Sequence, residues 1–501
     1  MASEVVRYDD WSGGEYGTIG GRQAPRGSWS GLNMMLYRNG SVGPRAGVKF
    51  TTPSGLPGGT MWGFASRPVP GADGLVVTGT GLYTFDLSVP SAPASLLGNL
   101  SQVPTAPVAI LAVPGAVYVS SVGDRTYKEA GAGVVILNTY GGRYLATHGT
   151  RLVIGHLTET PGGPVFLRRL RWSDAANDTF SAANFADAGD PWHISALHPQ
   201  RDVLTIAKQN QWLVLTGSLA DLGGTVGLDA TIRRAARQDG PLRIESATGA
   251  DERVWFQGLF DRHPSFWTGS AATRLAYLEY TTSTPNAGSD ASPSVLVAAL
   301  DKPGSTERGA AFFSPGDGRL ALLHNGAWSF HSIGVGVSSP RLAVSDGLLH
   351  IGGGGAVLSW DYATDRPGDG TGVASQGDVS STPVPANLVL PQWWASGGES
   401  VQVRSVIVEF DSYSTASPSS NHFDLLVDTL GPYQGDGVVT ATAQAFDRPT
   451  SGGTAGVAHR ATFGIDGSRG GGFAIRLDAI RGCAIRAVTA IVDIEAAWSR
   501  A

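Results

Sequence analysis

Residues 319–330, RLALLHNGAWSF, contain the pattern that decides the fold class of this chain. An apolar run ends at Asn325 and Gly326, and a second run with two aromatic residues follows. Asn-Gly between such runs is a strong indicator of a β-hairpin, because both residues tolerate the positive φ angles of a type I′ turn. The segment therefore predicts two antiparallel strands.

The same theme of apolar run, Gly or Asn turn and second run recurs along residues 56–375. Further examples are residues 74–87, 116–127, 203–217, 254–267 and 348–362. Each hairpin is too small to bury its apolar face alone, and a repeat of roughly 35 to 60 residues is typical of four-stranded propeller blades. We expect an all-β fold with an irregular β-propeller of about six or seven blades. A pair of stacked β-sandwiches is the alternative.

Composition supports a folded chain with many tight turns. Of 501 residues, 42% are hydrophobic and only 16% charged, and the chain contains 69 Gly and 29 Pro. This composition is typical of a folded chain and not of a disordered one. The net charge of -6 without a basic stripe disfavours a dedicated DNA-binding protein. Cys483 is the single cysteine, which excludes an intramolecular disulfide and leaves no zinc-ligand spacing. The sequence shows neither a signal-peptide h-region nor a long apolar run, so we expect neither Sec export nor membrane insertion.

Four regions follow from the same patterns. Residues 1–55, rich in Gly, Arg and aromatics, predict an extended N-terminal arm with short strands that docks on a neighbour. Residues 56–375 predict the propeller, in which 173–187 form an inserted loop. Residues 376–390 are polar and rich in Gly and Pro, which indicates a linker. Residues 391–501 contain at least six alternating strands, typical of a jelly-roll-like β-sandwich.

Three segments together resemble a known family. The first comprises Trp11 to Gly14, Gly31 to Asn33 and Tyr37 to Gly47, the second Leu170 to Asp174 with Asp190 to Ile194, and the third Val203 to Gly217. They are similar to elements of bacteriophage tail nozzle proteins (tail tubular protein B-like) and of related stabilisation and minor tail proteins. In this chain the Gly-Gly and Gly-Leu-Asn elements are separated, whereas the family pattern fuses them. The resemblance covers about half of the chain.

The resemblance implies a structural component of a phage tail, assembled in the host cytoplasm. It implies a homo-oligomer, expected to be a hexameric ring, that forms part of the distal tail tube through which DNA is ejected. Other tail or adaptor proteins, the passing genome and the host cell surface are the implied partners. The weak overall charge agrees with a channel that does not retain DNA.

Searches for catalytic and metal-binding patterns favour a protein that is not an enzyme. His-Glu-x-x-His, phosphate-loop and Gly-x-Ser-x-Gly patterns are all missing from the sequence. Gly352 to Gly355 lie between two predicted strands, which favours a hairpin turn over a nucleotide site. Acidic residues at hairpin ends could form a glycosidase pair, but turn capping is the preferred interpretation; they are Asp86, Asp124, Asp261, Asp317, Asp346 and Asp361. We predict no catalytic residue, cofactor or metal site.

Histidine residues can be metal ligands and tryptophan residues can bind glycan, but both also occur as packing residues. The histidines show no tight ligand spacing and are interpreted as isolated structural residues; they are His193, His198, His263, His324, His331 and His350. The tryptophans could form a shelf for host glycan, but core and inter-blade packing is preferred; they are Trp62, Trp172, Trp212, Trp255, Trp267, Trp328 and Trp360.

The N-terminal arm supplies the predicted interface residues. Arginines interleaved with aromatic residues are enriched at protein interfaces. The candidates are Trp11, Arg22, Arg26, Trp29, Arg38 and Arg45. Three alternatives remain open at this point: a receptor-binding or glycan-binding minor tail protein, a glycan-degrading propeller enzyme, and a cellular propeller scaffold unrelated to phages.

Overall fold

The protein is described from a computed structural model. The described residues are 2–12, 14–15, 28–37, 39–45, 48–67, 69, 71–89, 92–130, 133–174, 179–189, 191–200, 202–219, 231–236, 238, 240–241, 247–250, 253–259, 264–274, 295–300, 309–316, 318–332, 339–345, 348–362, 386–396, 399–412, 422–431, 437–447 and 457–495. Within these ranges every regular element is a β-strand. They contain no helix long and apolar enough to cross a membrane.

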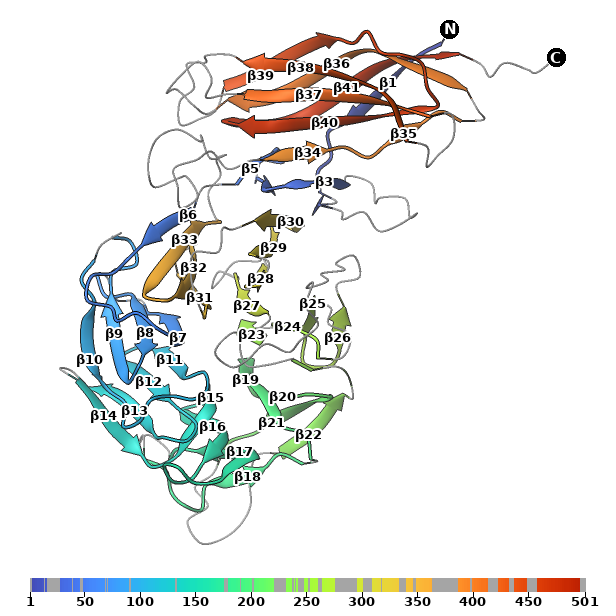
Figure 1. Ribbon diagram of the computed structural model, residues 1–501. Helices are drawn as coiled ribbons and strands as arrows, with labels where there is room; N and C mark the ends of the chain where they lie inside the picture. Colours follow the sequence, from blue (N-terminus) through green and yellow to red (C-terminus); the bar gives the residue numbers. More distant parts are fainter. Residues whose placement is uncertain are drawn as a thin grey trace.

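Seven four-stranded antiparallel sheets form a ring in the described part of the chain (Figure 1). The first strand of each sheet contacts the first strand of the next, and the contact between the seventh sheet and the first closes the ring. The sheets are therefore the blades of a seven-bladed β-propeller, which confirms the predicted fold and replaces "six or seven" by seven. The stacked-sandwich alternative is wrong.

The first four blades come from residues 61–236. Their strands are β7 (Met61–Ser66), β8 (Gly74–Thr78), β9 (Gly81–Phe85) and β10 (Ser95–Asn99); β11 (Ala109–Val113), β12 (Ala116–Ser120), β13 (Thr126–Ala130) and β14 (Gly133–Asn138); β15 (Gly141–His148), β16 (Arg151–Thr158), β17 (Val165–Trp172) and β18 (Phe185–Asp187); β19 (Ile194–Gln200), β20 (Val203–Lys208), β21 (Gln211–Thr216) and β22 (Thr231–Ala236).

The remaining blades include one strand from the N-terminal region. Blade 5 consists of β23 (Ala247–Ala250), β24 (Arg253–Gln257), β25 (Pro264–Trp267) and β26 (Ala272–Arg274). Blade 6 consists of β27 (Leu296–Ala299), β28 (Ala310–Ser314), β29 (Arg319–His324) and β30 (Ala327–Ser332). Blade 7 consists of β31 (Arg341–Ser345), β32 (Leu348–Gly353), β33 (Ala356–Asp361) and β6 (Val48–Thr51). Because β6 precedes blade 1 in the sequence, the chain links it covalently to that blade. Its hydrogen bonds to β33 make it the outer strand of blade 7, so β6 closes the ring between the last blade and the first.

Hairpin turns fall where the sequence predicts them. Asn325 and Gly326 both have positive φ between β29 and β30, and Gly354 and Gly355 do so between β32 and β33. Positive φ at both central residues is the requirement of a type I′ turn. The run Gly352 to Gly355 is thus a strand end and a turn, as expected.

Two further sheets pack face to face as a β-sandwich. One sheet has the order β39-β36-β41-β5-β4 with β1 also beside β41, and the other has the order β2-β3-β34-β40-β37-β38 with β35 beside β40. The strands are β1 (Ala2–Tyr8), β2 (Gly14–Glu15), β3 (Ser28–Leu32), β4 (Met34–Leu36), β5 (Val42–Pro44), β34 (Asn387–Val389), β35 (Trp393–Trp394), β36 (Ser400–Ser412), β37 (His422–Leu430), β38 (Val438–Asp447), β39 (Val457–Gly464), β40 (Gly472–Arg481) and β41 (Cys483–Glu495).

The sandwich corrects two predicted boundaries. The described part of residues 1–55 is not a separate arm, because β1 pairs with β41 from Ala2↔Ile494 to Tyr8↔Val488, and β3 pairs with β34. The predicted linker 376–390 ends too late, because Asn387–Val389 is already a strand of the sandwich. Most of that linker lies outside the described residues, as do residues 175–178 of the predicted loop 173–187. The end of that loop is predicted wrongly, because Phe185–Asp187 is β18, the outer strand of blade 3.

Tryptophan residues pack between the blades, as predicted. Trp172, Trp212, Trp255, Trp267 and Trp360 are at most 1% exposed, whereas Trp62 and Trp328 are partly buried. Trp212 of blade 4 stacks on Trp267 of blade 5 with ring centroids 4.7 Å apart. Neighbouring blades are thus joined by apolar side chains of large area.

Replacing Trp212 by Ala should lower the free energy of unfolding by about 3–5 kcal/mol, because the substitution empties a fully buried site between two blades. The midpoint and slope of urea unfolding, followed by circular dichroism, measure the change. Val103→Ala is the matched control, since Val103 is 61% exposed and should change stability by less than about 0.5 kcal/mol. Equal effects of the two substitutions would contradict the packing role.

Candidate functional site

The residues that connect the propeller to the sandwich lie between β3 and β6. The backbone N–H of Asn33 donates to the carbonyl of Phe330 in β30 at 3.1 Å, and Asn325 Nδ2 donates to the carbonyl of Leu36 at 3.0 Å. Both bonds join the sandwich to the outer strand of blade 6 or its turn. In Figure 1 the sandwich accordingly lies beside the ring at β30 and β6.

Apolar side chains of the sandwich are part of the propeller core. Met35, Tyr37 and Ala484 are at most 2% exposed and belong to the same cluster as the buried residues of blades 6 and 7, such as Leu320 and Trp360. No sharp boundary separates the two cores at this place. The two domains are therefore joined by a continuous hydrophobic contact as well as by the chain.

Asn33 and Arg45 hold the connecting segment in its turn. Asn33 has a φ of 59°. Its backbone carbonyl accepts a hydrogen bond from the backbone N–H of Arg45 at 2.8 Å. Its side-chain Oδ1 accepts a second one from the Nε of Arg45 at 3.1 Å. Asn tolerates positive φ better than most residues. Gly43 has no room for a side chain, because a Cβ there would lie 2.9 Å from the Tyr37 ring and 3.0 Å from the carbonyl of Cys483.

These contacts revise the predicted interface. Trp11, Trp29 and Arg45 are 2%, 1% and 1% exposed, so they pack inside the chain and have almost no surface to offer a neighbour. Trp11 Nε1 also donates to the carbonyl of Arg486 at 2.9 Å. For these three residues the docking prediction is wrong, since the segment pairs with its own C-terminal domain. Arg22, Arg26 and Arg38 lie outside the described residues.

His331 of β30 lies in the same junction. Its Nε2 is 2.8 Å from Ser329 Oγ, and its ring meets the Trp360 ring edge-on at 4.8 Å between centroids. Burial, and to a smaller extent the charge of Arg45, hold the pKa of His331 well below its ordinary value of 6.5. Burial also lowers the pKa of His350 in β32 to about 4.

The other histidines named in the sequence analysis do not gather in one place. His193 packs its ring against His156, and His324 packs against Tyr362. Burial lowers the pKa of His198 to about 4, and His263 lies outside the described residues. Among the described residues, no three His, Cys, Asp or Glu side chains gather in a geometry that could hold a metal ion.

Of the described acidic residues at hairpin ends, Asp86 caps its own turn and Asp124 does not. Asp86 Oδ1 accepts from the backbone N–H of Ser88 at 2.8 Å, and Asp124 accepts from the N–H groups of Ser101 and Gln102 and from the Tyr127 hydroxyl. The predicted capping is therefore confirmed for Asp86. For Asp124 it is wrong, because its carboxylate binds the backbone of the segment that follows β10. Asp261, Asp317 and Asp346 lie outside the described residues, and nothing is described for the side chain of Asp361.

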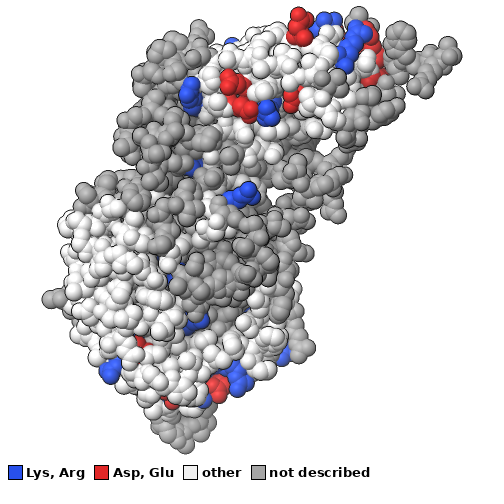
Figure 2. Space-filling model, in the orientation of Figure 1, with Lys and Arg blue, Asp and Glu red and all other residues white. Residues whose placement is uncertain are grey.

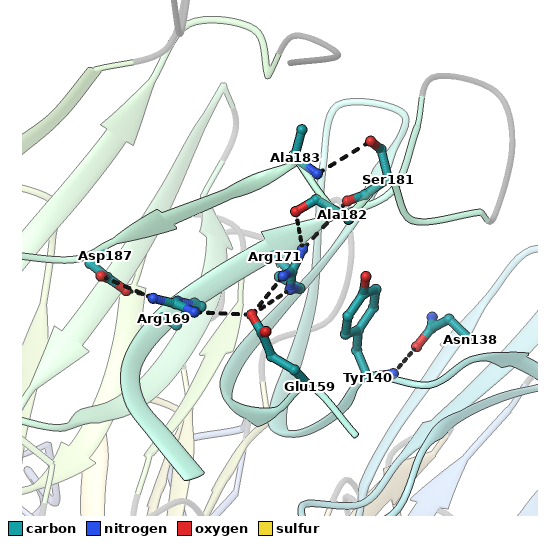
Figure 3. A network of polar contacts seen from close by, with 9 residues as sticks. All are labelled: Asn138, Tyr140, Glu159, Arg169, Arg171, Ser181, Ala182, Ala183 and Asp187. Atoms are coloured by element: carbon teal, nitrogen blue, oxygen red, sulfur yellow. Dashed lines mark hydrogen bonds and ion pairs between the residues drawn. The ribbon is translucent and has the colours of Figure 1, made fainter. Parts of the chain in front are cut away.

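Blade 3 contains a network that the sequence analysis missed (Figure 3). Arg171 Nη2 lies 2.6 Å from Glu159 Oε1, and the guanidinium carbon lies 4.2 Å from the Tyr140 ring centroid. Arg169 lies 3.0 Å from both Glu159 and Asp187. Burial opposes ionisation of Glu159, but its hydrogen bonds to the two arginines lower its pKa overall.

Aromatic rings complete this network. The Arg169 guanidinium lies 4.2 Å from the Phe166 ring and 4.6 Å from the Phe185 ring, and Arg171 lies 5.2 Å from Phe185. Arg171 also donates to the carbonyl of Ala182 at 2.9 Å. The network therefore fixes β18 and the connection before it. Its sequence signal is the alternation of Arg169 and Arg171, which places both side chains on one face of a strand.

Comparisons with known proteins found only distant similarity to solved structures. No protein-family model and no curated protein matches the chain. Among the similar solved structures, the computationally designed protein Ika8 has 13% identity and a TM-score of 0.40, with 63% of this chain and 100% of that chain covered. BamB from Moraxella catarrhalis has 13% identity and a TM-score of 0.39, with 66% of this chain and 96% of that chain covered. The Pan2 WD40 domain from Neurospora crassa has 10% identity and a TM-score of 0.41, with 64% of this chain and 95% of that chain covered. Similarity at this level carries no argument, so the description of the fold rests on the strand pairing given above.

Replacing Asn33 tests the turn at the junction. Asn33→Gly keeps the positive φ but removes the acceptor for Arg45, and should cost about 1.5–3 kcal/mol. Asn33→Ala should cost roughly 1–2 kcal/mol more, because Ala is strained in the left-handed region. Urea unfolding measures both, with the exposed Asn99→Ala as control. Equal stability of both Asn33 variants and the wild type would show that the turn is not needed.

The histidines predict a specific loss of stability in acid. Because the folded state keeps His331 neutral and the unfolded state protonates it near pH 6.5, the free energy of unfolding should fall as the pH drops below 6.5. His331→Gln should make this fall shallower by up to about 1.4 kcal/mol per pH unit. Urea unfolding at several pH values measures the slope. A slope unchanged by the substitution would contradict the neutral, buried imidazole.

Proposed function

We propose that this chain is a structural protein of a bacteriophage tail, part of the distal tail tube, that acts through assembly and shape. The observation that carries the proposal is the position of the residues behind the family resemblance. Asn33, Gly43 and Arg45 lie in the junction between the propeller and the sandwich, and Gly31 lies just before it, in β3 of the sandwich. At Gly31 a Cβ would lie 2.2 Å from the carbonyl oxygen of Asn387.

The other two segments that resemble the phage tail family also lie where packing and hydrogen bonds restrict the residue type. Arg171 is in the blade 3 network, and Trp172 is fully buried between blades. Ser173 accepts hydrogen bonds from the Leu152 N–H and the Arg151 side chain, which tie β17 to β16. Residues 203–217 are the central hairpin of blade 4. Residues in such positions fix an architecture, which is what the resemblance implies for a tail protein.

A rigid joint between the domains suits a mechanical role. In the junction, a shared apolar core and hydrogen bonds oppose movement of the sandwich relative to the propeller. A tail component has to keep its shape while its neighbours assemble and DNA passes. We therefore place its function in the virion, as an oligomer in contact with other tail proteins.

Deleting the gene from the phage that encodes this chain tests the proposal. We expect particles that lack tails or carry incomplete tails in negative-stain electron microscopy, with infectivity restored by the wild-type gene in trans. The chain should also be present in purified wild-type particles by mass spectrometry. Complete tails that fail to adsorb would indicate receptor binding instead. Normal infectivity of the deletion, or absence of the chain from purified particles, would refute the tail role.

A further inference from the structure

His331 lies where the sandwich meets blades 6 and 7. Its side chain is 1% exposed, and its strand, β30, contacts β2, β3 and β4 of the sandwich. The residue opposite His331 in blade 6 is Leu320, which shares a buried cluster with Met35 of the sandwich and Trp360 of blade 7. A charge at His331 therefore acts on the contact between the two domains.

The surroundings of the imidazole suit its neutral form. Its Nε2 lies 2.8 Å from Ser329 Oγ, whereas its Nδ1 is buried without a hydrogen-bond partner among the described residues. The doubly protonated ring would carry a hydrogen on Nδ1 with no acceptor, and a buried donor without an acceptor is unfavourable. An opening that lets water reach Nδ1 removes this cost.

Arg45 also opposes a positive charge at this place. It is 1% exposed, and its charge, after burial, is a cause of the lowered pKa of His331. Protonation in the closed form therefore puts a second buried cation near Arg45, where water does not screen the repulsion. Of the strands around β30, β3 and β4 contain no ionisable residue. Such residues are Arg319 and His324 at the ends of β29, and Glu15 of β2 and Asp361 of β33, whose side chains lie outside the described part of the chain.

At this contact the strand pairing of each domain stays within that domain. Among the described strands, β30 pairs with β29 of its own blade, and β3 and β4 pair with strands of the sandwich. The backbone N–H of Asn33 crosses the contact and donates to the carbonyl of Phe330 at 3.1 Å. The space-filling view shows the sandwich and the propeller as two masses, one above and one below the contact (Figure 2). The contact can therefore open without breaking a strand pair of either domain.

We propose that this contact is an acid-sensitive joint: protonation of His331 releases the sandwich from blade 6, while both domains keep their fold. At neutral pH the uncharged ring stays buried and the shared apolar cluster is closed. In the open form His331 reaches water and regains its ordinary pKa of 6.5, so acid stabilises the open form over the closed one. Below that pH the ratio of open to closed molecules should rise by up to about tenfold for each pH unit. This inference goes beyond the proposed tail role and does not depend on it.

Hydrogen exchange at the Asn33 amide tests the joint in the full-length chain, because this N–H is bonded across the contact. Exchange is followed by NMR on protein with isotope-labelled asparagine, and comparison with the intrinsic rate at the same pH gives a protection factor. Protection factors report an open form even when it is rare. Repeating the measurement in low urea separates local opening from global unfolding, since only global unfolding exposes enough surface to respond strongly.

In the wild type, protection of Asn33 should fall by up to about tenfold per pH unit between about pH 6.5 and about pH 5, with little response to urea. His331→Gln, or His331→Asn if the Gln variant does not fold, should remove this fall, because neither side chain takes up a proton. His350→Gln is the matched control and should keep the fall. His350 is also buried, but it lies in blade 7 with both ring nitrogens 2.8 Å from serine hydroxyls.

Three results would overturn the inference. They are constant protection of Asn33 in the wild type, the same fall in the His331 variants, and a strong response of the protection to urea. Each of them would leave the tail role intact, since that role is tested on virions.

Discussion

The pairing of the N-terminal segment with both domains is the constraint on which the rest of the structure depends. Between Ala2 and Thr51, the chain contributes β1 to β5 to the sandwich and β6 to blade 7. The same segment therefore closes the ring and completes the partner domain. Neither domain has its full set of strands without it, so the two domains form one structural unit.

The junction shows how this constraint is met by particular side chains. Positive φ at Asn33, the missing side chain at Gly43 and the buried Arg45 allow the chain to turn from one domain to the other within a few residues. A buried guanidinium requires hydrogen-bond acceptors, and Asn33 provides one of them through its side chain. The neutral His331 beside it adds a dependence on pH to the same joint.

The sequence predicted local features well and long-range pairing poorly. Hairpins such as 319–330 were identified because turn type depends on the two turn residues themselves. The position of β1 could not be inferred, because its partners in β41 lie at least 480 residues away, as in Tyr8↔Val488, and no local pattern encodes that register. For the same reason Trp11, Trp29 and Arg45 suggested an intermolecular interface, although their actual partners are within the chain. Composition identifies residue types suited to interfaces but not which chain they contact.

Electron cryo-microscopy of purified phage particles in which mass spectrometry detects this chain is the most direct test of the proposed role as a structural tail protein. The account predicts density in the tail into which the propeller and the sandwich fit together in the relative arrangement described above, in several copies. Tail density into which no such propeller fits would contradict the account. So would a sandwich whose orientation relative to the propeller varies from copy to copy.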